Sequence, residues 1–333
     1  MTATLGINLM AVDPPDRFVE VARFVESAGF SHMLVADSSL HARDVYPYLT
    51  LLATHTSSIR IGPSVIHPYT RHPAVNANAL ATVNEIANGR VIVNIGAGDR
   101  PVMELGYPIA RLTVVREAVA VIRLLLAGQP ASFAGETFRL HDAALRFGRR
   151  DRMPVYVTAS GPRMLELAGE VADGVLFLAG SDPRCVRFAL DRIAAGVARS
   201  GRRLSDLVLG CNIYGALEDD RAAAMDACRA IAAWFPQTAP HYAELIGVPK
   251  DRVDAIRRAY AGGHFDEARG ALDLVTDDMV EAFALAGNTG VWIERLEAIQ
   301  SMGVNLFVIY PMVADKLGTI RRIAAEILPR FRR

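Results

Sequence analysis

The sequence predicts an α/β protein with the fold of a (β/α)8 barrel, also called a TIM barrel. Short runs rich in β-branched residues alternate with segments of helical period, which is typical of repeated βα units around a parallel sheet. Hydrophobic residues make up 51% of the 333 residues and charged residues 22%, a balance that allows a large buried core. Barrels of this class fold as one unit over about 200 to more than 400 residues. We therefore expect a single domain over residues 1–333.

Eight apolar runs have the length and composition of barrel strands. Their near-continuous apolarity suits strands that are buried on both faces of a parallel sheet. The expected strands cover residues 5–10, 32–37, 60–66, 90–98, 154–160, 174–180, 207–217 and 305–311.

Helices are expected between these strands. In the first of them, apolar residues recur at the spacing of one helical face, namely Phe18, Val21, Ala22 and Val25. A second helix is expected to begin at His72-Pro73, because proline suits the first helical position, and to end at Asn88-Gly89.

Two segments interrupt the alternation of strands and helices. Residues 131–147 are expected to form a small hairpin or an extended excursion before the fifth strand. Residues 232–287, after the seventh strand, have a helical pattern and are rich in Ala and Asp. Loops at the carboxyl ends of barrel strands carry function. We therefore interpret 232–287 as a helical insertion that serves either as a lid over the active site or as a dimerisation or packing element.

Charge, hydropathy and cysteine content argue against a nucleic-acid or membrane partner and indicate where the protein works. Lys plus Arg and Asp plus Glu both number 36, so there is no basic excess to indicate a nucleic-acid or acidic-membrane partner. No apolar stretch approaches the ~18 residues of a transmembrane helix, and the N-terminus lacks the pattern of a signal peptide. The three cysteines lie far apart without a C-x-x-C pair, which indicates reduced thiols in the cytoplasm.

Candidate functional residues lie just past the strand ends, because active sites of these barrels form at the carboxyl face. The sequence has no G-x-S-x-G or P-loop motif, so hydrolase and NTPase functions lack support. The histidines show no metal-ligand spacing, and we expect no metal site. The candidates are Asp37, Ser38, Ser64, Val65, His67, Gly96, Ala97, Gly98, Asp99, Ala159, Ser160, Gly161 and Tyr310.

The segment TASGP is the most informative of these strand ends. A strand runs into Ser160-Gly161, and Pro162 then begins a helix, so free backbone N–H groups and the positive helix end face the barrel mouth. Such an arrangement binds phosphate. The alternative is a tight turn in which glycine is needed for its backbone angles.

Two other strand ends allow two interpretations each. The glycines of GAGD, residues 96–99, either let a planar ligand approach the backbone or form only a close-packed turn. Asp37 follows a buried strand, where a carboxylate without a partner is costly. Its partner is expected to be either a ligand N–H or an arginine of the barrel.

Two long blocks resemble the luciferase-like oxidoreductases, particularly those that depend on coenzyme F420. The first block is GPSVIHPYTRHPAVNANALATVNEIANGRVIVNIGAGD and the second is PVYVTASGPRMLELAGEVADGVLFLAG. With Asp37 and the chain ends, the resemblance extends over essentially the whole sequence.

The resemblance implies a deazaflavin ring across the barrel mouth and a non-proline cis peptide, here Ser64-Val65, behind the ring. It places Asp37 at the polar edge of the ring, His67 near the ring or its side chain, and residues 96–99 beside it. It assigns residues 159–161 to the cofactor phosphate. The implied reaction is hydride transfer between F420 and a small organic substrate, in which the cofactor supplies the difficult chemistry.

Within this resemblance, Asp37, Ser38 and Asp99 are the catalytic candidates, and a homodimer is expected. Members that act on glucose 6-phosphate or secondary alcohols carry His where this chain has Ser38, and the sugar-phosphate members carry Lys where it has Ser181. The pattern is closer to the methylenetetrahydromethanopterin reductase-like group. The alternatives are an FMN-dependent monooxygenase of the same superfamily and a barrel that binds ligands without catalysis.

Overall fold

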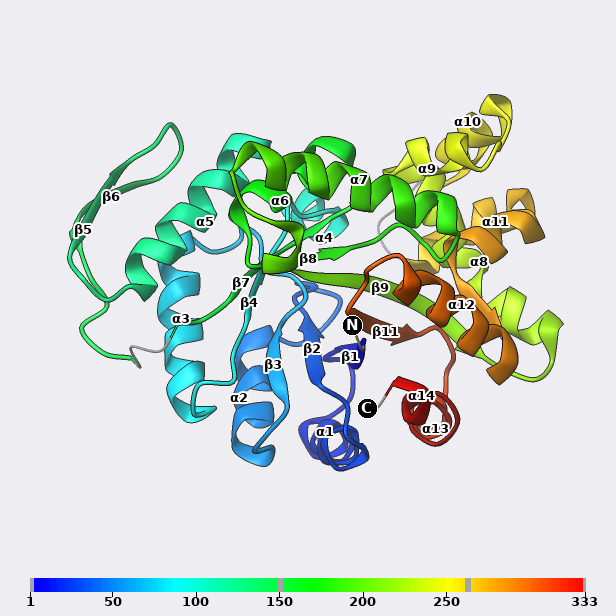
Figure 1. The fold of residues 1–333 in the computed structure, drawn as a ribbon, viewed down its shortest axis with the longest axis horizontal. Coiled ribbons are helices and arrows are strands. Elements are labelled where there is room, and N and C mark those ends of the chain that lie inside the picture. The colour runs from blue at the N-terminus through cyan, green and yellow to red at the C-terminus, as the bar shows by residue number, and fades with distance from the viewer. Residues whose placement is uncertain (1–2, 149–151, 261–264, 332–333) are drawn as a thin grey trace.

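Eight parallel strands form the barrel in a computed structural model that describes residues 3–148, 152–260 and 265–331 (Figure 1). They are ordered β3-β2-β1-β11-β9-β8-β7-β4, and bridges Ile61–Val91 and Ile66–Ile95 join β4 to β3. The (β/α)8 prediction is confirmed. The strands are β1 (Thr4–Met10), β2 (His32–Ala36), β3 (Arg60–Pro63), β4 (Val93–Ile95), β7 (Val155–Ala159), β8 (Gly174–Phe177), β9 (Val208–Leu217) and β11 (Leu306–Pro311).

The strands are buried on both faces, which explains their near-continuous apolarity. Alternate side chains point into the barrel, where one cluster fills its interior, and the opposite faces pack against the surrounding helices. The interior cluster consists of Leu34, Ile92, Tyr156, Leu176, Leu306 and Val308.

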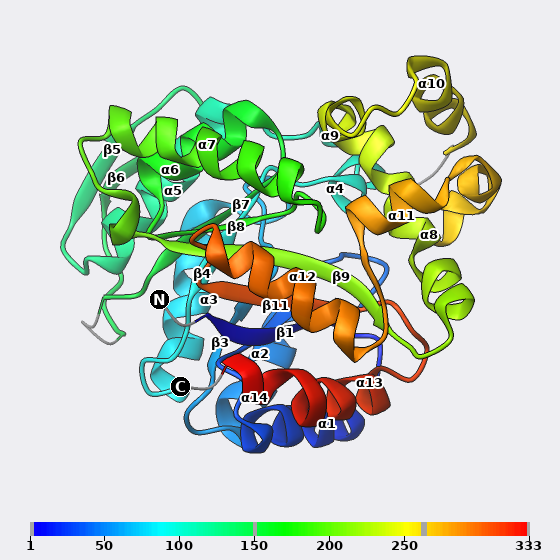
Figure 2. The same ribbon diagram turned by 45° about the vertical axis from the view of Figure 1, so that its right-hand side comes forward.

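The helices lie around the barrel as the periodicity predicts (Figures 1 and 2). Helix α1 (Pro15–Ala28) buries the four residues predicted for its inner face. Helix α3 (Pro73–Ile86) begins after His72, whose Nδ1 accepts a hydrogen bond from the Ala74 N–H. The other helices of the ring are α2 (Val45–His55), α4 (Arg100–Glu104), α5 (Leu112–Leu126), α6 (Pro162–Val171), α7 (Pro183–Arg199), α12 (Thr289–Ser301), α13 (Lys316–Arg322), η3 (Ile323–Ile327) and α14 (Leu328–Phe331). A single turn, η1 (Leu204–Asp206), precedes β9.

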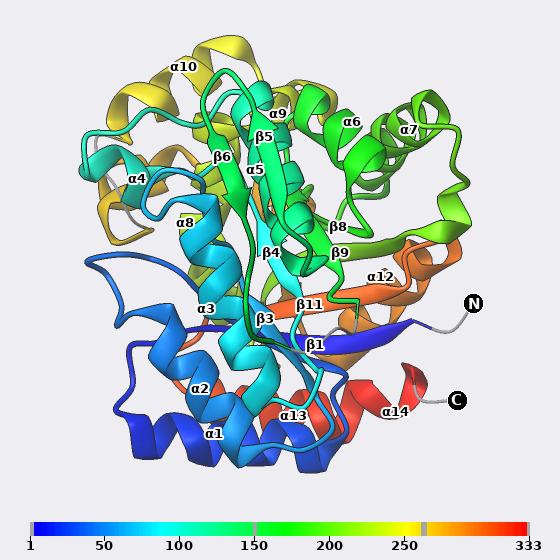
Figure 3. The same cartoon turned by 90° about the vertical axis from the view of Figure 1, so that its left-hand side faces the viewer.

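Residues 131–147, the first segment that interrupts the alternation, contain a hairpin, which is one of the two forms predicted for them. Strands β5 (Ala131–Ala134) and β6 (Arg139–Ala143) pair in antiparallel fashion and lie beside α5 (Figure 3).

The second interruption is helical but ends in a strand. Figures 1 and 2 show its helices grouped at one side of the barrel. The first helix begins at Arg221, before the predicted boundary at 232, and β10 (Leu285–Gly287) pairs in parallel with β9. A three-residue strand is too short to show a period, so the assignment of 285–287 to a helix was wrong. The helices are α8 (Arg221–Thr238), α9 (Pro240–Leu245), α10 (Lys250–Ala259), η2 (Phe265–Leu274) and α11 (Asp277–Phe283).

Across the described ranges, no helix has the length and apolarity that a bilayer crossing requires.

Candidate active site at the barrel mouth

A cavity of about 400 Å³ lies at the carboxyl ends of the strands. Parallel strands bring their carboxyl ends to one edge, so residues far apart in sequence meet there. The structure brings together every predicted site residue. Asp37, Ser38, Ser64, Val65, His67, Gly96, Ala97, Gly98, Asp99, Ala159, Ser160 and Gly161 all line this cavity, and Tyr310 lines it too.

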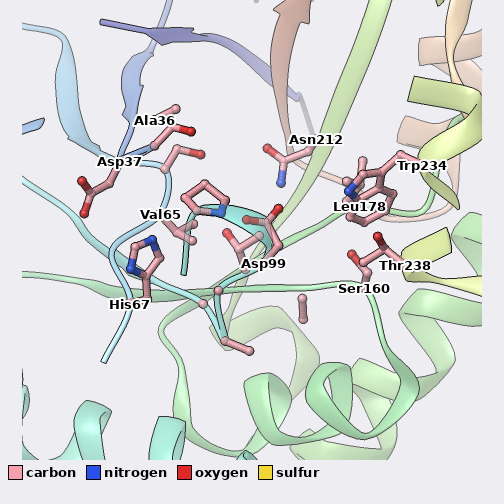
Figure 4. A pocket seen from close by; sticks show the side chains of 18 of the residues that line it. Ala36, Asp37, Val65, His67, Asp99, Ser160, Leu178, Asn212, Trp234 and Thr238 are labelled. Carbon is pink, nitrogen blue, oxygen red and sulfur yellow. The ribbon is translucent and has the colours of Figure 1, made fainter. Parts of the chain in front are cut away.

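The Asp37 carboxylate has a protein partner. Arg71 Nη1 donates to Asp37 Oδ2 over 2.7 Å, and the Asp37 side chain is only 2% exposed. Burial raises the pKa of Asp37, although the Arg71 guanidinium opposes this shift. Figure 4 shows the carboxylate turned away from Asp99 and Asn212. Of the two partners expected from the sequence, the structure supplies the arginine.

The segment after β3 forms one wall of the cavity. The peptide bond between Ser64 and Val65 is cis, as the resemblance implies. A methyl group on Gly96 would lie 2.9 Å from Val65 Cγ2, so glycine at 96 allows this segment and β4 to approach closely. His67 Nδ1 lies 2.8 Å from Thr70 Oγ1, and burial lowers the pKa of His67. Its imidazole is therefore neutral near pH 7.

The Ser160-Gly161 turn opens into the cavity at the start of α6. Gly161 has φ −71°, which any residue adopts, and a Cβ there would meet nothing within 4 Å. The alternative that glycine is needed for its backbone angles is therefore wrong. Its missing side chain leaves space beside the first N–H groups of α6. The Ser160 carbonyl accepts hydrogen bonds from Tyr242 Oη (3.1 Å) and His241 Nε2 (3.2 Å), which fix this turn to α9.

The helical insertion supplies part of the cavity wall. Figure 4 shows Trp234 and Thr238 of α8 at the same end of the cavity as Ser160, and Tyr260 lines it as well. This placement agrees with the lid interpretation. The sequence gives no signal for these residues, because their contact with the barrel depends on how the insertion folds back.

Two asparagines in the barrel strands were also missed. Asn8 and Asn212 line the cavity and are 5% and 6% exposed. Asn8 Oδ1 is buried without a hydrogen-bond partner among the described residues. Both could have been noticed as polar residues inside otherwise apolar runs, since a buried amide needs partners.

The site suits an organic cofactor. It combines a cavity, glycines along one wall, free N–H groups at a helix start and a buried acceptor, Asn8 Oδ1, that a ligand donor would satisfy. The described ranges contain no group of three or more His, Cys, Asp or Glu able to hold a metal ion. Ser181, where the resemblance places a lysine in sugar-phosphate enzymes, does not line the described cavity, and its hydroxyl donates to the Ala284 carbonyl over 2.7 Å.

The sequence profile of the luciferase-like monooxygenases matches residues 2–306. The chain belongs to this family. Its relatives include a 5,10-methylenetetrahydromethanopterin reductase of Archaeoglobus fulgidus, which is 34% identical over 96% of this chain and 98% of its own length. An F420-dependent glucose-6-phosphate dehydrogenase of Beutenbergia cavernae is 32% identical over 92% of this chain and 90% of its own length.

Solved structures agree with this membership. The coenzyme F420-dependent tetrahydromethanopterin reductase of Methanopyrus kandleri superposes with a TM-score of 0.89, covers 100% of both chains and is 28% identical. A Streptomyces bottropensis monooxygenase at 18% identity has a TM-score of 0.73 over 99% of this chain and 100% of its own, and shows the shared fold.

Proposed function

We propose that this protein is an F420-dependent oxidoreductase that transfers a hydride between the deazaflavin and a small organic substrate. The observation that carries the proposal is full-length similarity to F420-dependent enzymes, combined with a cavity lined by every residue that the resemblance assigns to the cofactor. Bound F420 supplies the hydride chemistry, and the chain positions the reactants and excludes water. A pterin of the methylenetetrahydromethanopterin type is the first substrate to test, because the reductases are among the chain's relatives.

We assign the cofactor ring to the wall made by Ser64, Val65 and residues 96–99, and its phosphate to residues 159–161. His67 is neutral and adjoins this wall, so it can donate or accept one hydrogen bond without adding charge. Ser38 and Asp99 are our candidates for polarising the ring or substrate. Asp37 is assigned a positioning role, because its carboxylate is paired with Arg71.

The cofactor assignment is tested by titrating the purified apoprotein with F420 and FMN in parallel, read by fluorescence. Tight binding of F420 and weak binding of FMN supports the proposal. FMN is the second candidate because the family includes monooxygenases. Tight FMN binding without F420 binding would assign the chain to that group.

The substrate is tested with reduced F420 and 5,10-methylenetetrahydromethanopterin, following the absorbance of oxidised F420. Glucose 6-phosphate with oxidised F420 is the matched comparison, since Ser38 and Ser181 depart from the pattern of the sugar-phosphate enzymes. Faster turnover of the sugar phosphate than of the pterin would overturn this substrate assignment.

We further propose that residues 1–333 act as one domain, because barrel and insertion both line the cavity. We propose a cytoplasmic homodimer, with buried cysteines in keeping with reduced thiols. Light scattering at several protein concentrations measures the assembly, and a monomeric mass throughout would exclude the dimer.

A further inference from the structure

Tyr310 lies at the end of the last barrel strand and faces the cavity. It is 8% exposed and lines the cavity from β11. Its ring stacks on Tyr214 of β9, with which it is aligned in register, at a centroid distance of 5.1 Å and an interplanar angle of 27°. The ring is therefore held against the barrel wall.

Lys316, in the first turn of α13, fixes the Tyr310 hydroxyl. Lys316 Nζ donates to Tyr310 Oη over 3.2 Å and lies 4.8 Å from the ring centroid. An ammonium group has no acceptor, so Tyr310 Oη must accept this hydrogen bond. The hydroxyl proton is then left for a different partner, and the cavity is where a ligand can provide one.

Several other polar groups of the cavity are engaged or poorly suited to release a proton. Asp37 is held by Arg71, and the neutral His67 imidazole contacts Thr70. Burial raises the pKa of Tyr214, which makes its proton harder to release. Serine and threonine hydroxyls are far weaker acids than a phenol. The Tyr310 oxygen accepts its hydrogen bond from a half-buried ammonium group, which can stabilise the phenolate that forms when the proton leaves.

We propose that Tyr310 donates a proton to the substrate and that Lys316 is its positioning residue. This inference rests on the proposed function and deepens it. When the substrate carbon gains a hydride and forms a new C–H bond, the electron pair of its bond to nitrogen or oxygen moves to that heteroatom. The heteroatom takes the Tyr310 proton. The phenolate left behind is stabilised by the Lys316 ammonium and regains a proton from solvent. The substrate class is therefore a compound with a C=N, C=O or activated C–N group.

The test compares Tyr310→Phe and Lys316→Met with Tyr107→Phe as the matched control. Tyr107 is 45% exposed, stacks on Tyr69 and does not line the described cavity, so its variant loses a hydroxyl outside the site. F420 affinity is measured by fluorescence for each protein. Single-turnover reduction of 5,10-methylenetetrahydromethanopterin is then followed as a function of pH.

We expect Tyr310→Phe to bind F420 within about twofold of wild type but to react at least ~100-fold more slowly, the usual size of general acid catalysis. Lys316→Met should be intermediate with a changed pH profile, and Tyr107→Phe should match wild type. A Tyr310→Phe variant that turns over at the wild-type rate, or that fails to bind F420, overturns the assignment of Tyr310 as proton donor.

A second readout does not need turnover. The Raman doublet of tyrosine, taken as the difference from Tyr310→Phe, reports whether the phenol oxygen accepts a hydrogen bond, and it should differ between wild type and Lys316→Met. Identical doublets refute the contact between Lys316 and the Tyr310 oxygen and overturn the proposal. If wild type binds F420 but leaves the pterin unchanged, the substrate assignment fails, and this Raman comparison still decides on the Tyr310–Lys316 pair.

Discussion

The Arg71–Asp37 ion pair can be broken on one side by Arg71→Met, which keeps a long side chain but removes the charge. Arg71 does not line the described cavity, whereas Asp37 does. The variant leaves a carboxylate that is 2% exposed without its guanidinium partner. Unit charges about 4 Å apart interact by about 4 kcal/mol at an effective dielectric constant of 20. Breaking a buried pair by removing one partner costs about 3–5 kcal/mol.

We therefore expect Arg71→Met to lower the free energy of unfolding by about 3–5 kcal/mol near pH 7, measured by urea denaturation. The matched control is Arg221→Met, because the Arg221–Glu281 pair is exposed on both sides. Exposed pairs contribute about 0–1 kcal/mol, so the control should stay close to wild type.

The pH dependence gives an independent check of this reasoning. Burial raises the pKa of Asp37 in the folded state, and Arg71 opposes that shift. A carboxyl group whose pKa is raised in the folded state contributes its full stabilisation below its unfolded-state pKa of ~3.9. This stabilisation is lost as the pH rises through the folded-state pKa. Without Arg71 the folded pKa rises further, so the loss continues to higher pH.

The loss of unfolding free energy caused by Arg71→Met should accordingly be larger near pH 7 than near pH 5. It should change with pH by up to about 1.4 kcal/mol per pH unit. The double variant with Asp37→Asn has no carboxylate at this position and should lose this slope. A deficit below about 1 kcal/mol near pH 7, or one that does not change with pH, would refute the argument that a buried charge is left uncompensated.

Three further predictions concern other buried or open positions. Burial lowers the pKa of His32 to about 3. The free energy of unfolding should therefore fall by about 1.4 kcal/mol per pH unit as the pH drops from ~6.5 toward 3. His32→Gln should flatten this slope when urea denaturation is measured at several pH values. Gly161→Ala should keep the wild-type melting temperature yet weaken F420 binding, because its Cβ enters open space at the turn; unchanged affinity would argue against phosphate there. Burial raises the pKa of all three thiols, so a disulfide reagent should react far faster with the urea-unfolded chain than with the native protein at Cys185, Cys211 and Cys228.

Local sequence pattern was sufficient to predict the barrel and the strand-end residues. Apolar runs and helical spacing depend on neighbours in the chain, so α1 and α3 and the eight barrel strands could be predicted from short segments. The same reasoning failed at β10, whose three residues pair with β9 and are too few to show a period. It also could not decide between the two interpretations of Gly161, because a sequence does not reveal the sign of φ.

The order of strands along the chain by itself placed the predicted cofactor and catalytic residues at one edge, since parallel strands of a barrel share that edge whatever their side chains. Tertiary structure decided which groups satisfy one another there. Arg71 rather than a ligand meets Asp37, Lys316 meets Tyr310, and Trp234 of the insertion reaches the cavity. These contacts depend on how distant segments pack in three dimensions, and no spacing along the chain encodes that packing.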